Sequence, residues 1–283
     1  MTAGSPLDAL LPPEMAQRAE EIGAAKVTMD RGRLLALAVL AGAFIAFGGI
    51  FSTVALAGAS GAPWGATRVL AGVVFSVGLI LVIVGGAELF TGNNLIVMAW
   101  AGGRVSTWAL LRNWTLVYVG NFAGAVGIAL LACGGRLHEA GGGAIGATAL
   151  GIAAAKLQLG FVQAVLLGIL CNVLVCLAVW LAYSARSTTD RVLAIVPPIA
   201  AFVAAGFEHS VANMYFVPFA LLVTFLDPGF TAARVIDIHT LTWGDFIVRN
   251  LLPVTLGNVI GGALLVGGVY WFVYLRPRPR PGE

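Results

Sequence analysis

Residues 85–94 read GGAELFTGNN and interrupt the second of six long apolar stretches. A second interruption, GFEHSVAN at residues 206–213, falls in the fifth stretch. Each carries an acid at the same place, Glu88 in one and Glu208 in the other. Glycine beside charged and amide side chains is a poor continuation of an apolar helix, and Gly92-Asn93 is a turn signal. We therefore predict that helices two and five are broken here.

The composition indicates a membrane protein. Of the 283 residues, 59% are hydrophobic and only 10% are charged, whereas a soluble domain carries about 25% charged residues. A membrane-spanning helix needs about 20 apolar residues. We therefore expect an all-α integral membrane protein with six transmembrane helices, at residues 34–58, 69–101, 107–133, 158–184, 192–226 and 246–275.

The chain divides into three predicted regions. Residues 1–33 form a cytoplasmic N-terminal segment with a short helix, because Pro12 and Glu14 are typical of a helix start. Residues 34–275 form the transmembrane domain, and residues 276–283 form a cytoplasmic basic tail. No signal peptide is expected in residues 1–33, which have no apolar core.

The distribution of basic residues predicts the orientation. With both termini inside, the cytoplasmic segments hold 11 of the 16 lysines and arginines and the outer segments hold 5. This bias favours both termini in the cytoplasm of a multi-pass bacterial inner-membrane protein. The basic residues lie between spans rather than on one face, so the net charge of +3 does not indicate a nucleic-acid partner.

The chain contains an internal repeat. Residues 38–42 resemble 164–168, residues 86–93 resemble 206–213, and residues 113–124 resemble 250–261, at offsets of 126, 120 and 137. The matches keep their order in spans one to three and four to six. Three spans per half put the second half in the membrane upside down, as in transporters whose site lies at the repeat interface. We therefore predict two inverted three-helix repeats.

Few acids and histidines lie at mid-span, where a charge costs roughly 2.5–3.5 kcal/mol. They are Glu88, Glu208 and His209. We interpret the two acids as acceptors for loop N–H groups, with Asn93 and Asn213 stabilising the same loops, and Glu208 as a neighbour that also tunes His209. Half-helix N-termini attract anions, and an imidazole can gain or lose a proton near neutral pH.

The same stretches resemble the formate/nitrite transporter family. Four motifs carry the resemblance: residues 86–93 (GAELFTGN), 168–172 (GILCN), 206–214 (GFEHSVANM) and 250–258 (NLLPVTLGN). The resemblance covers about residues 30–275 and implies an aquaporin-like bundle that assembles as a homopentamer with one pore per subunit.

The resemblance also implies a pathway. Thr91 and His209 would line its centre, with Asn172 nearby. Lys156 would be the vestibule lysine. Constrictions would be formed on the outer side by Phe75 and Phe202, and on the inner side by Leu79, Leu89, Phe90 and Val175.

We therefore expect a passive or proton-coupled channel for small monovalent anions, formate first, in which His209 modulates the protonation of the anion. Nitrite and hydrosulfide stay open, because Gly92-Asn93-Asn94 stands where the enteric formate channels are serine-rich. The expected partners are these anions, protons, the lipid bilayer and further copies of the chain. No cofactor is expected, and no metal, because the three histidines lack ligand spacing.

Two other classes of membrane protein share parts of this pattern. A neutral-solute pore of the water or glycerol type shares broken helices but uses Asn-Pro-Ala turns, which neither interruption contains. An intramembrane serine protease would use the Gly-x-Ser-Gly pattern at Gly58–Gly61, but Ser60 lies in a loop rather than in a span. The sequence therefore favours a channel over an enzyme.

Overall fold

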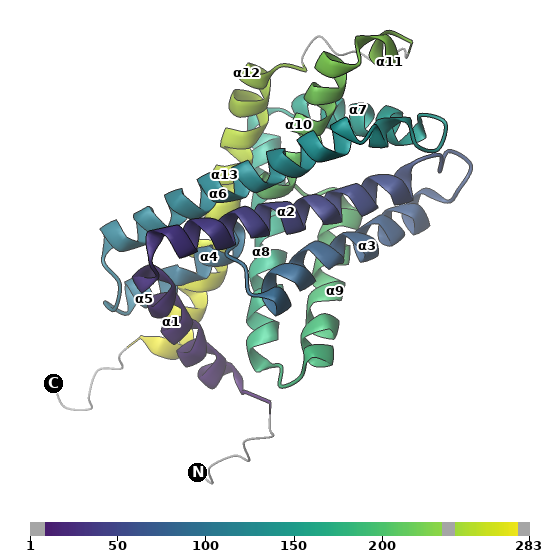
Figure 1. Ribbon diagram of the computed structural model, residues 1–283. Helices are drawn as coiled ribbons and strands as arrows, with labels where there is room; N and C mark the ends of the chain where they lie inside the picture. Colours follow the sequence, from purple (N-terminus) through teal and green to yellow (C-terminus); the bar gives the residue numbers. More distant parts are fainter. Residues whose placement is uncertain (1–8, 234–240, 277–283) are drawn as a thin grey trace, which may run out of the picture.

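The computed structural model describes residues 9–233 and 241–276, and within them every regular element is helical (Figure 1). Six described helices are long and apolar enough to cross a membrane: α2 (Arg31–Leu56), α3 (Trp64–Gly85), α6 (Thr107–Gly134), α8 (Phe161–Ser184), α9 (Thr188–Ala205) and the last helix, Trp243–Leu275.

The remaining elements are shorter. They are α1 (Pro12–Thr28), α4 (Phe90–Asn93), η1 (Asn94–Ile96), α5 (Val97–Ala101), η2 (Leu137–Glu139), α7 (Ala144–Leu157), α10 (Ser210–Leu226) and α11 (Pro228–Ala232). The last helix consists of α12 (Trp243–Asp245), η3 (Phe246–Leu251), α13 (Leu252–Val259), η4 (Ile260–Gly268) and η5 (Trp271–Leu275). Of the predicted basic tail only Arg276 is described, and its guanidinium lies 5.0 Å from the centre of the Phe272 ring.

The two predicted helix breaks are confirmed, but at a slightly different place. The backbone leaves α3 at Gly86 and α9 at Gly206, with φ angles of 81° and 76°. This left-handed conformation favours glycine. The interpretation of Gly92-Asn93 as a turn was wrong, because both residues lie in α4. The chain is extended only from the left-handed glycine to the residue before Phe90 or Ser210.

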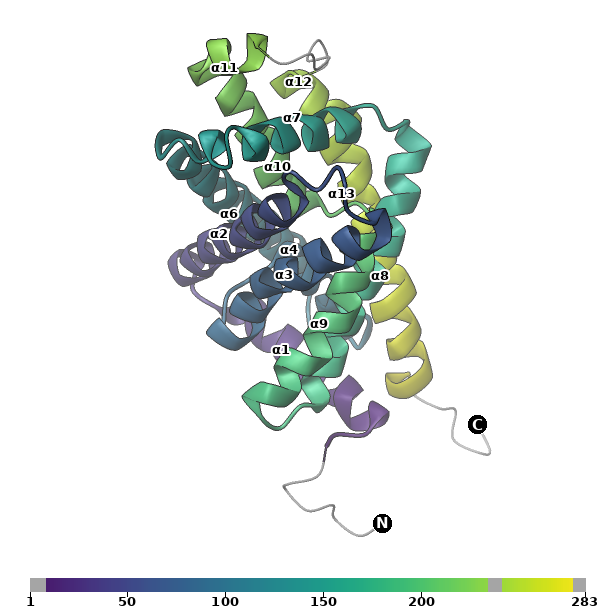
Figure 2. The ribbon, with the colours of Figure 1, turned by 90° about the vertical axis from the view of Figure 1, so that its right-hand side faces the viewer.

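The inverted repeat is visible in the arrangement of the helices. Helix α1 lies on the lower side in Figures 1 and 2, together with the turn between α8 and α9, while α7 lies across the upper side. We call these two sides the α1 face and the α7 face. The extended segments after α3 and α9 meet between the two faces.

The register of the repeat differs from the sequence prediction at its first match. The Glu88 N–H donates to Leu37 O and the Glu208 N–H donates to Leu167 O. Leu37 is therefore equivalent to Leu167, an offset of 130 rather than 126. The matches at offsets of 120 and 137 are confirmed by the mirrored hydrogen bonds described below. Short apolar strings match by chance, whereas a backbone hydrogen bond fixes the equivalence.

The repeat also contains an element that the sequence analysis left out. Residues 144–157 lie between the predicted spans, but they form α7, whose Lys156 stands 130 positions after Lys26 in α1. The two lysines make mirrored contacts. Helix α1 is therefore the counterpart of α7, and each half of the molecule has a short helix before its three spanning segments.

Close helix packing depends on glycines in both halves. A Cβ on Gly124 of α6 would overlap the Val39 carbonyl oxygen of α2, and a Cβ on Gly257 of α13 would overlap the Val165 carbonyl oxygen of α8. Small residues let helices approach in lipid, where packing rather than hydrophobic burial drives association. These glycines therefore set the distance between paired helices in each half.

We expect Gly124→Ala to destabilise the protein by about 1–3 kcal/mol, as overpacking does in other interiors. The measurement is thermal unfolding of the detergent-solubilised protein. Gly127→Ala is the matched control, because it lies on the same helix and a Cβ there meets nothing within 4 Å. Equal melting temperatures for the two variants would contradict the packing argument.

Candidate functional site

A buried ion pair holds the first break. The Lys26 ammonium of α1 donates to Glu88 Oε1 and to Asn93 Oδ1, each at 2.8 Å. The Asn93 amide donates to Glu88 Oε2 at 2.7 Å and to Asn113 Oδ1 at 3.0 Å, and Asn113 donates to the carbonyl oxygen of Lys26 at 3.4 Å. The carboxylate of Glu88 is therefore satisfied by two donors although its side chain is only 7% exposed.

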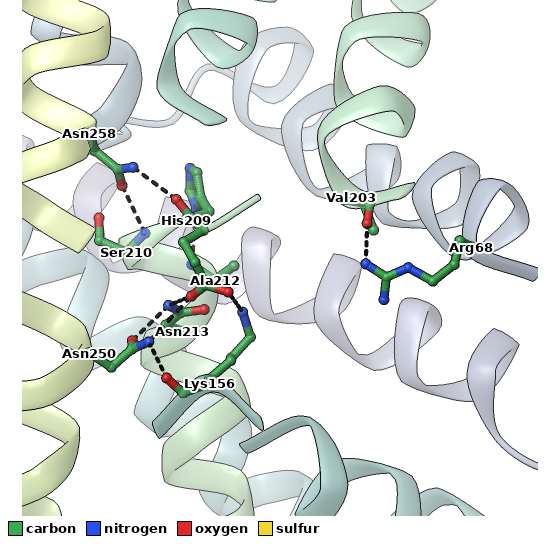
Figure 3. Close-up of polar contacts among 10 residues, drawn as sticks. Arg68, Lys156, Val203, His209, Ser210, Ala212, Asn213, Asn250 and Asn258 are labelled. Atoms are coloured by element: carbon green, nitrogen blue, oxygen red, sulfur yellow. Dashed lines mark hydrogen bonds and ion pairs between the residues drawn. The ribbon is translucent and has the colours of Figure 1, made fainter. Parts of the chain in front are cut away.

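The second break repeats this arrangement (Figure 3). The Lys156 ammonium donates to Glu208 Oε1 at 2.7 Å, and the Asn213 amide donates to Glu208 Oε2 and to Asn250 Oδ1, both at 2.7 Å. Asn250 in turn donates to the carbonyl oxygen of Lys156 at 3.2 Å. We call these two networks the α1 clamp and the α7 clamp.

Two further asparagines hold the extended segments. Asn121 Oδ1 accepts the Phe90 N–H, while its amide donates to the carbonyl oxygens of Ala38 and Glu88. Asn258 does the same for the Ser210 N–H, at 2.9 Å, and donates to the carbonyl oxygens of Gly168 and Glu208 (Figure 3). The prediction that the glutamates accept loop N–H groups is thus corrected: side-chain donors satisfy the glutamates, and Asn121 and Asn258 accept the loop N–H groups.

Thr91 and His209 meet where the two breaks converge. Thr91 Oγ1 lies 2.9 Å from His209 Nε2, and both residues are buried. The Ala212 N–H donates to His209 Nδ1 at 3.0 Å, so this nitrogen carries no proton. The single proton of the neutral ring is then on Nε2, and Thr91 accepts it. The Thr91 hydroxyl hydrogen has no acceptor among the described residues.

Asn172 lies beside this pair. Its amide donates to Thr91 O at 3.3 Å, to Asn94 Oδ1 at 2.8 Å and to Asn258 O at 2.7 Å. Its Oδ1 is buried without a hydrogen-bond partner among the described residues. The predicted neighbours Thr91, His209 and Asn172 are therefore together, and Asn172 connects the first half-helix to Asn258 of α13.

A cavity of about 260 Å³ leads from the α7 face to His209. Its lining includes Lys156, Phe75, Phe202 and Phe216. The Phe75 and Phe202 rings meet edge to face with centres 5.7 Å apart, and Phe202 stacks on the imidazole at 5.9 Å. The Lys156 ammonium lies 5.5 Å from the centre of the Phe216 ring. The Lys156 ammonium and three phenylalanine rings therefore stand together at the approach to the imidazole.

A larger cavity, of about 650 Å³, opens on the α1 face. Lys26 and Glu88 contribute to its wall, and Leu79, Val82 and Leu89 form an apolar part of its lining. The two cavities have no lining residue in common. Phe75, Leu79 and Val82 recur at helical spacing on α3, so this one helix lines both cavities.

Comparison with known proteins agrees with this arrangement. The family profile described as formate/nitrite transporter matches residues 13–272. The chain belongs to the formate/nitrite transporter family. It is 44% identical over 280 residues to the formate channel FocA of Escherichia coli strain K12, covering 98% of each chain. It is also 39% identical over 282 residues to a probable formate transporter of Methanothermobacter thermautotrophicus, covering 94% of this chain and 97% of the relative.

Two solved structures show the same fold. One is a pentameric formate channel with formate bound, with a TM-score of 0.82, 44% identity, and coverage of 87% of this chain and 98% of the other. The second is an ion channel of the formate/nitrite transporter family, with a TM-score of 0.79, 27% identity, and coverage of 93% and 99%. The predicted family and fold class are confirmed.

Phe90 and Val175, which the resemblance placed at the inner constriction, line neither cavity. The Phe90 ring packs edge to face on Tyr118 and Trp114 of α6, with centres 4.9 and 6.2 Å away, and lines a surface groove instead of either cavity. Val175 is buried in the core and also lines neither cavity. Leu79 and Leu89 are the predicted inner residues that do line the α1-face cavity.

Sequence reasoning missed two important groups. Lys26 was assigned to a separate N-terminal segment, although its offset of 130 from Lys156 could have identified it. Arg68 was not singled out, yet it donates to the carbonyl oxygen of Val203 at 2.6 Å (Figure 3) and to that of Ala204 at 3.2 Å. It thus satisfies carbonyl groups at the C-terminal end of α9, which a helix leaves unpaired.

Other polar groups lie outside the pathway. On the α7 face, His138, Glu139 and Asp227 place possible metal-ligand atoms within 4.8 Å of one another, but Arg136 forms an ion pair with Glu139. The pKa of Asp227 lies below its ordinary value, because the Phe230 N–H and the His138 side chain donate to its carboxylate. Ser60 is exposed in the connection after α2, with no histidine contact found among the described residues.

We expect Asn121→Ala and Asn258→Ala to destabilise the fold by similar amounts. Each removes the partner of one buried N–H and two carbonyl oxygens, at roughly 1–3 kcal/mol per unsatisfied group. Thermal unfolding followed by tryptophan fluorescence measures both. Gln158→Ala, an exposed position at the end of α7, is the control. A melting temperature equal to that of the control in either variant would contradict the assigned role.

Proposed function

We propose that this protein is a channel for small monovalent anions, with formate as the first substrate. The observation that carries the proposal is the meeting of an imidazole N–H with the Thr91 hydroxyl group at the end of an aromatic cavity, in a chain 44% identical to a solved channel with formate bound. The two oxygens of formate suit these two donors, and the remainder of the ion is small enough for a narrow passage.

Entry begins at the lysines. Lys156 stands in the α7-face cavity and Lys26 in the α1-face cavity, so each mouth has a cation that raises the local concentration of anions. Each lysine is paired with a glutamate, which keeps its attraction weak enough for release. Conduction requires sites that bind transiently.

Thr91 and His209, at the centre of the pathway, then replace the water that the anion has lost. An anion that passes Phe75 and Phe202 loses hydration, at a free-energy cost. It would take the place of Thr91 as the acceptor of the His209 Nε2–H, and the freed Thr91 hydroxyl group would donate to its second oxygen. The N–H groups of Phe90, Ser210 and Ala212 already have side-chain partners. These three N–H groups are therefore not the donors that the anion meets.

Proton coupling would need a second proton on the ring. His209 can lend a proton only after Nδ1 is protonated, and the Ala212 N–H opposes this in the present conformation. We propose that the neutral ring serves passive flow. Release of the Ala212 N–H would let Nδ1 take up a proton from solution, and the ring would then give its Nε2 proton to the anion and return to the neutral form. The anion would then cross the Leu79 and Leu89 constriction as a neutral acid.

We further propose a bacterial inner-membrane location with the α1 face in the cytoplasm, based on the distribution of basic residues. The assembly we propose is a homopentamer with one pore per subunit, as in the pentameric relative. Nitrite and hydrosulfide are the alternative substrates within the family. A glycerol-type pore is disfavoured, because a neutral solute gains nothing from a cation at both mouths.

Currents across planar bilayers test the substrate class. We expect formate and nitrite to carry current, and chloride to carry at least about tenfold less, because it has no second oxygen for Thr91. Hydrosulfide is measured in the same series. Liposomes that swell in glycerol while formate carries no current would overturn the proposal in favour of a neutral-solute pore.

His209→Asn tests the imidazole. The asparagine oxygen can keep the cap on the Ala212 N–H, while the Nε2–H is lost, so we expect normal folding with proton uptake per formate reduced at least about tenfold. Formate uptake into proteoliposomes with an internal pH-sensitive dye measures the ratio. His138→Asn, outside both cavities, is the control. Unchanged proton coupling in His209→Asn would refute the role of the ring.

A further inference from the structure

The α1-face cavity is lined by more cations than a monovalent substrate needs. Arg18 and Lys26 line it from α1, Arg191 lines it from the start of α9, and Arg186 lines it from the connection between α8 and α9. These groups come from two separate parts of the chain, and they surround one volume of about 650 Å³. Ligand pockets of small molecules typically have about 300–1,000 Å³.

The acids near this cavity offset only part of that charge. Among the described residues that line the cavity, Glu88 is the one acid, and Lys26 is already its ion-pair partner. Glu21 lies 3.9 Å from Arg18, with both side chains more than half exposed, so this pair is weak. Asp190 accepts the N–H groups of Ser187 and Arg186. Even without Arg186, the guanidinium groups of Arg18 and Arg191 add positive charge to the cavity beyond the Lys26–Glu88 pair.

The α7-face cavity lacks this feature. It is lined by one arginine, Arg68, whose guanidinium donates to two carbonyl oxygens of α9. Its volume of about 260 Å³ is also smaller. The two mouths are therefore mirrored in their lysine clamps but not in their arginines. The bias of basic residues toward the cytoplasmic side accounts for arginines on the α1 face, but it does not require that they line one cavity, which suits a second role specific to that side.

We propose that the α1-face cavity binds a soluble phosphate-bearing anion with two or more negative charges, which blocks the channel from that side. This inference rests on the proposed function. Guanidinium groups match phosphate oxygens in a forked geometry. The cavity lining also includes Leu79, Val82 and Leu89. These apolar side chains cannot replace the water that a multiply charged ion would lose on passing them. Such an anion enters, is held by the arginines and obstructs the passage of formate.

The probe for this site is inorganic pyrophosphate. It is added to one side of a phosphatidylcholine bilayer, which has no net charge on its headgroups, while formate current is recorded. We expect block from the α1 face and none from the α7 face. Arg191→Gln should raise the half-blocking concentration about threefold, and the double variant Arg18→Gln/Arg191→Gln should raise it about tenfold. These factors correspond to the modest strength of ion pairs between partly exposed groups. Arg31→Gln, exposed on the same face outside the cavity, is the control and should change nothing.

Calorimetric titration of pyrophosphate onto the solubilised protein separates this inference from the proposed function. Pyrophosphate binding without any formate current would refute the proposed function and leave the site standing. Normal formate current with no block and no binding would overturn the site. Equal block from both faces, or an equal effect of Arg31→Gln and Arg191→Gln, would also overturn it, because both outcomes indicate general charge screening. Block that disappears in phosphatidylglycerol bilayers would assign the site to an anionic lipid headgroup and overturn the soluble ligand.

Discussion

A carboxylate buried in a membrane protein must have both a counter-charge and hydrogen-bond donors, and this constraint organises the whole molecule. Glu88 and Glu208 lie beside helix breaks, where backbone groups also lose their helical partners. Each is held by a lysine from a short helix outside the spanning segments and by an asparagine in its own half-helix. Removal of one partner from a buried pair leaves an uncompensated charge, at a cost of about 3–5 kcal/mol. The breaks and the two short helices are therefore mutually dependent.

Much of the fold could be predicted because breaks in apolar helices have local signals. Glycine, an acid and an asparagine at matched spacing identified both interruptions, and three spans per half required inversion. The register of the first span could not be predicted in the same way, because a string such as AVLAG at residues 38–42 has many chance matches in an apolar chain. Helix α7 was missed because its 14 residues are too few for a span.

The sequence predicted which residues of the candidate site lie together. It did not predict where the side chains point. Thr91, His209 and Asn172 were expected together and are in contact. The position of the Phe90 ring depends on Trp114 and Tyr118, which are distant in sequence. The tautomer of His209 depends on one backbone N–H, that of Ala212. The sequence pattern showed neither of these long-range or geometric facts.

The equivalence of α1 and α7 shows which features the two halves share and which belong to one half alone. If one unit of about 130 residues, the Lys26-to-Lys156 offset, gave rise to both halves, the ancestral assembly was a pair of identical chains inserted in opposite directions. Such a pair has the same residue at positions 89 and 209, where this chain has leucine and histidine. A single ring on one side is possible only where the two copies differ in sequence. Direction across the membrane is thus carried by side chains that differ between the halves, on a backbone frame that the halves share.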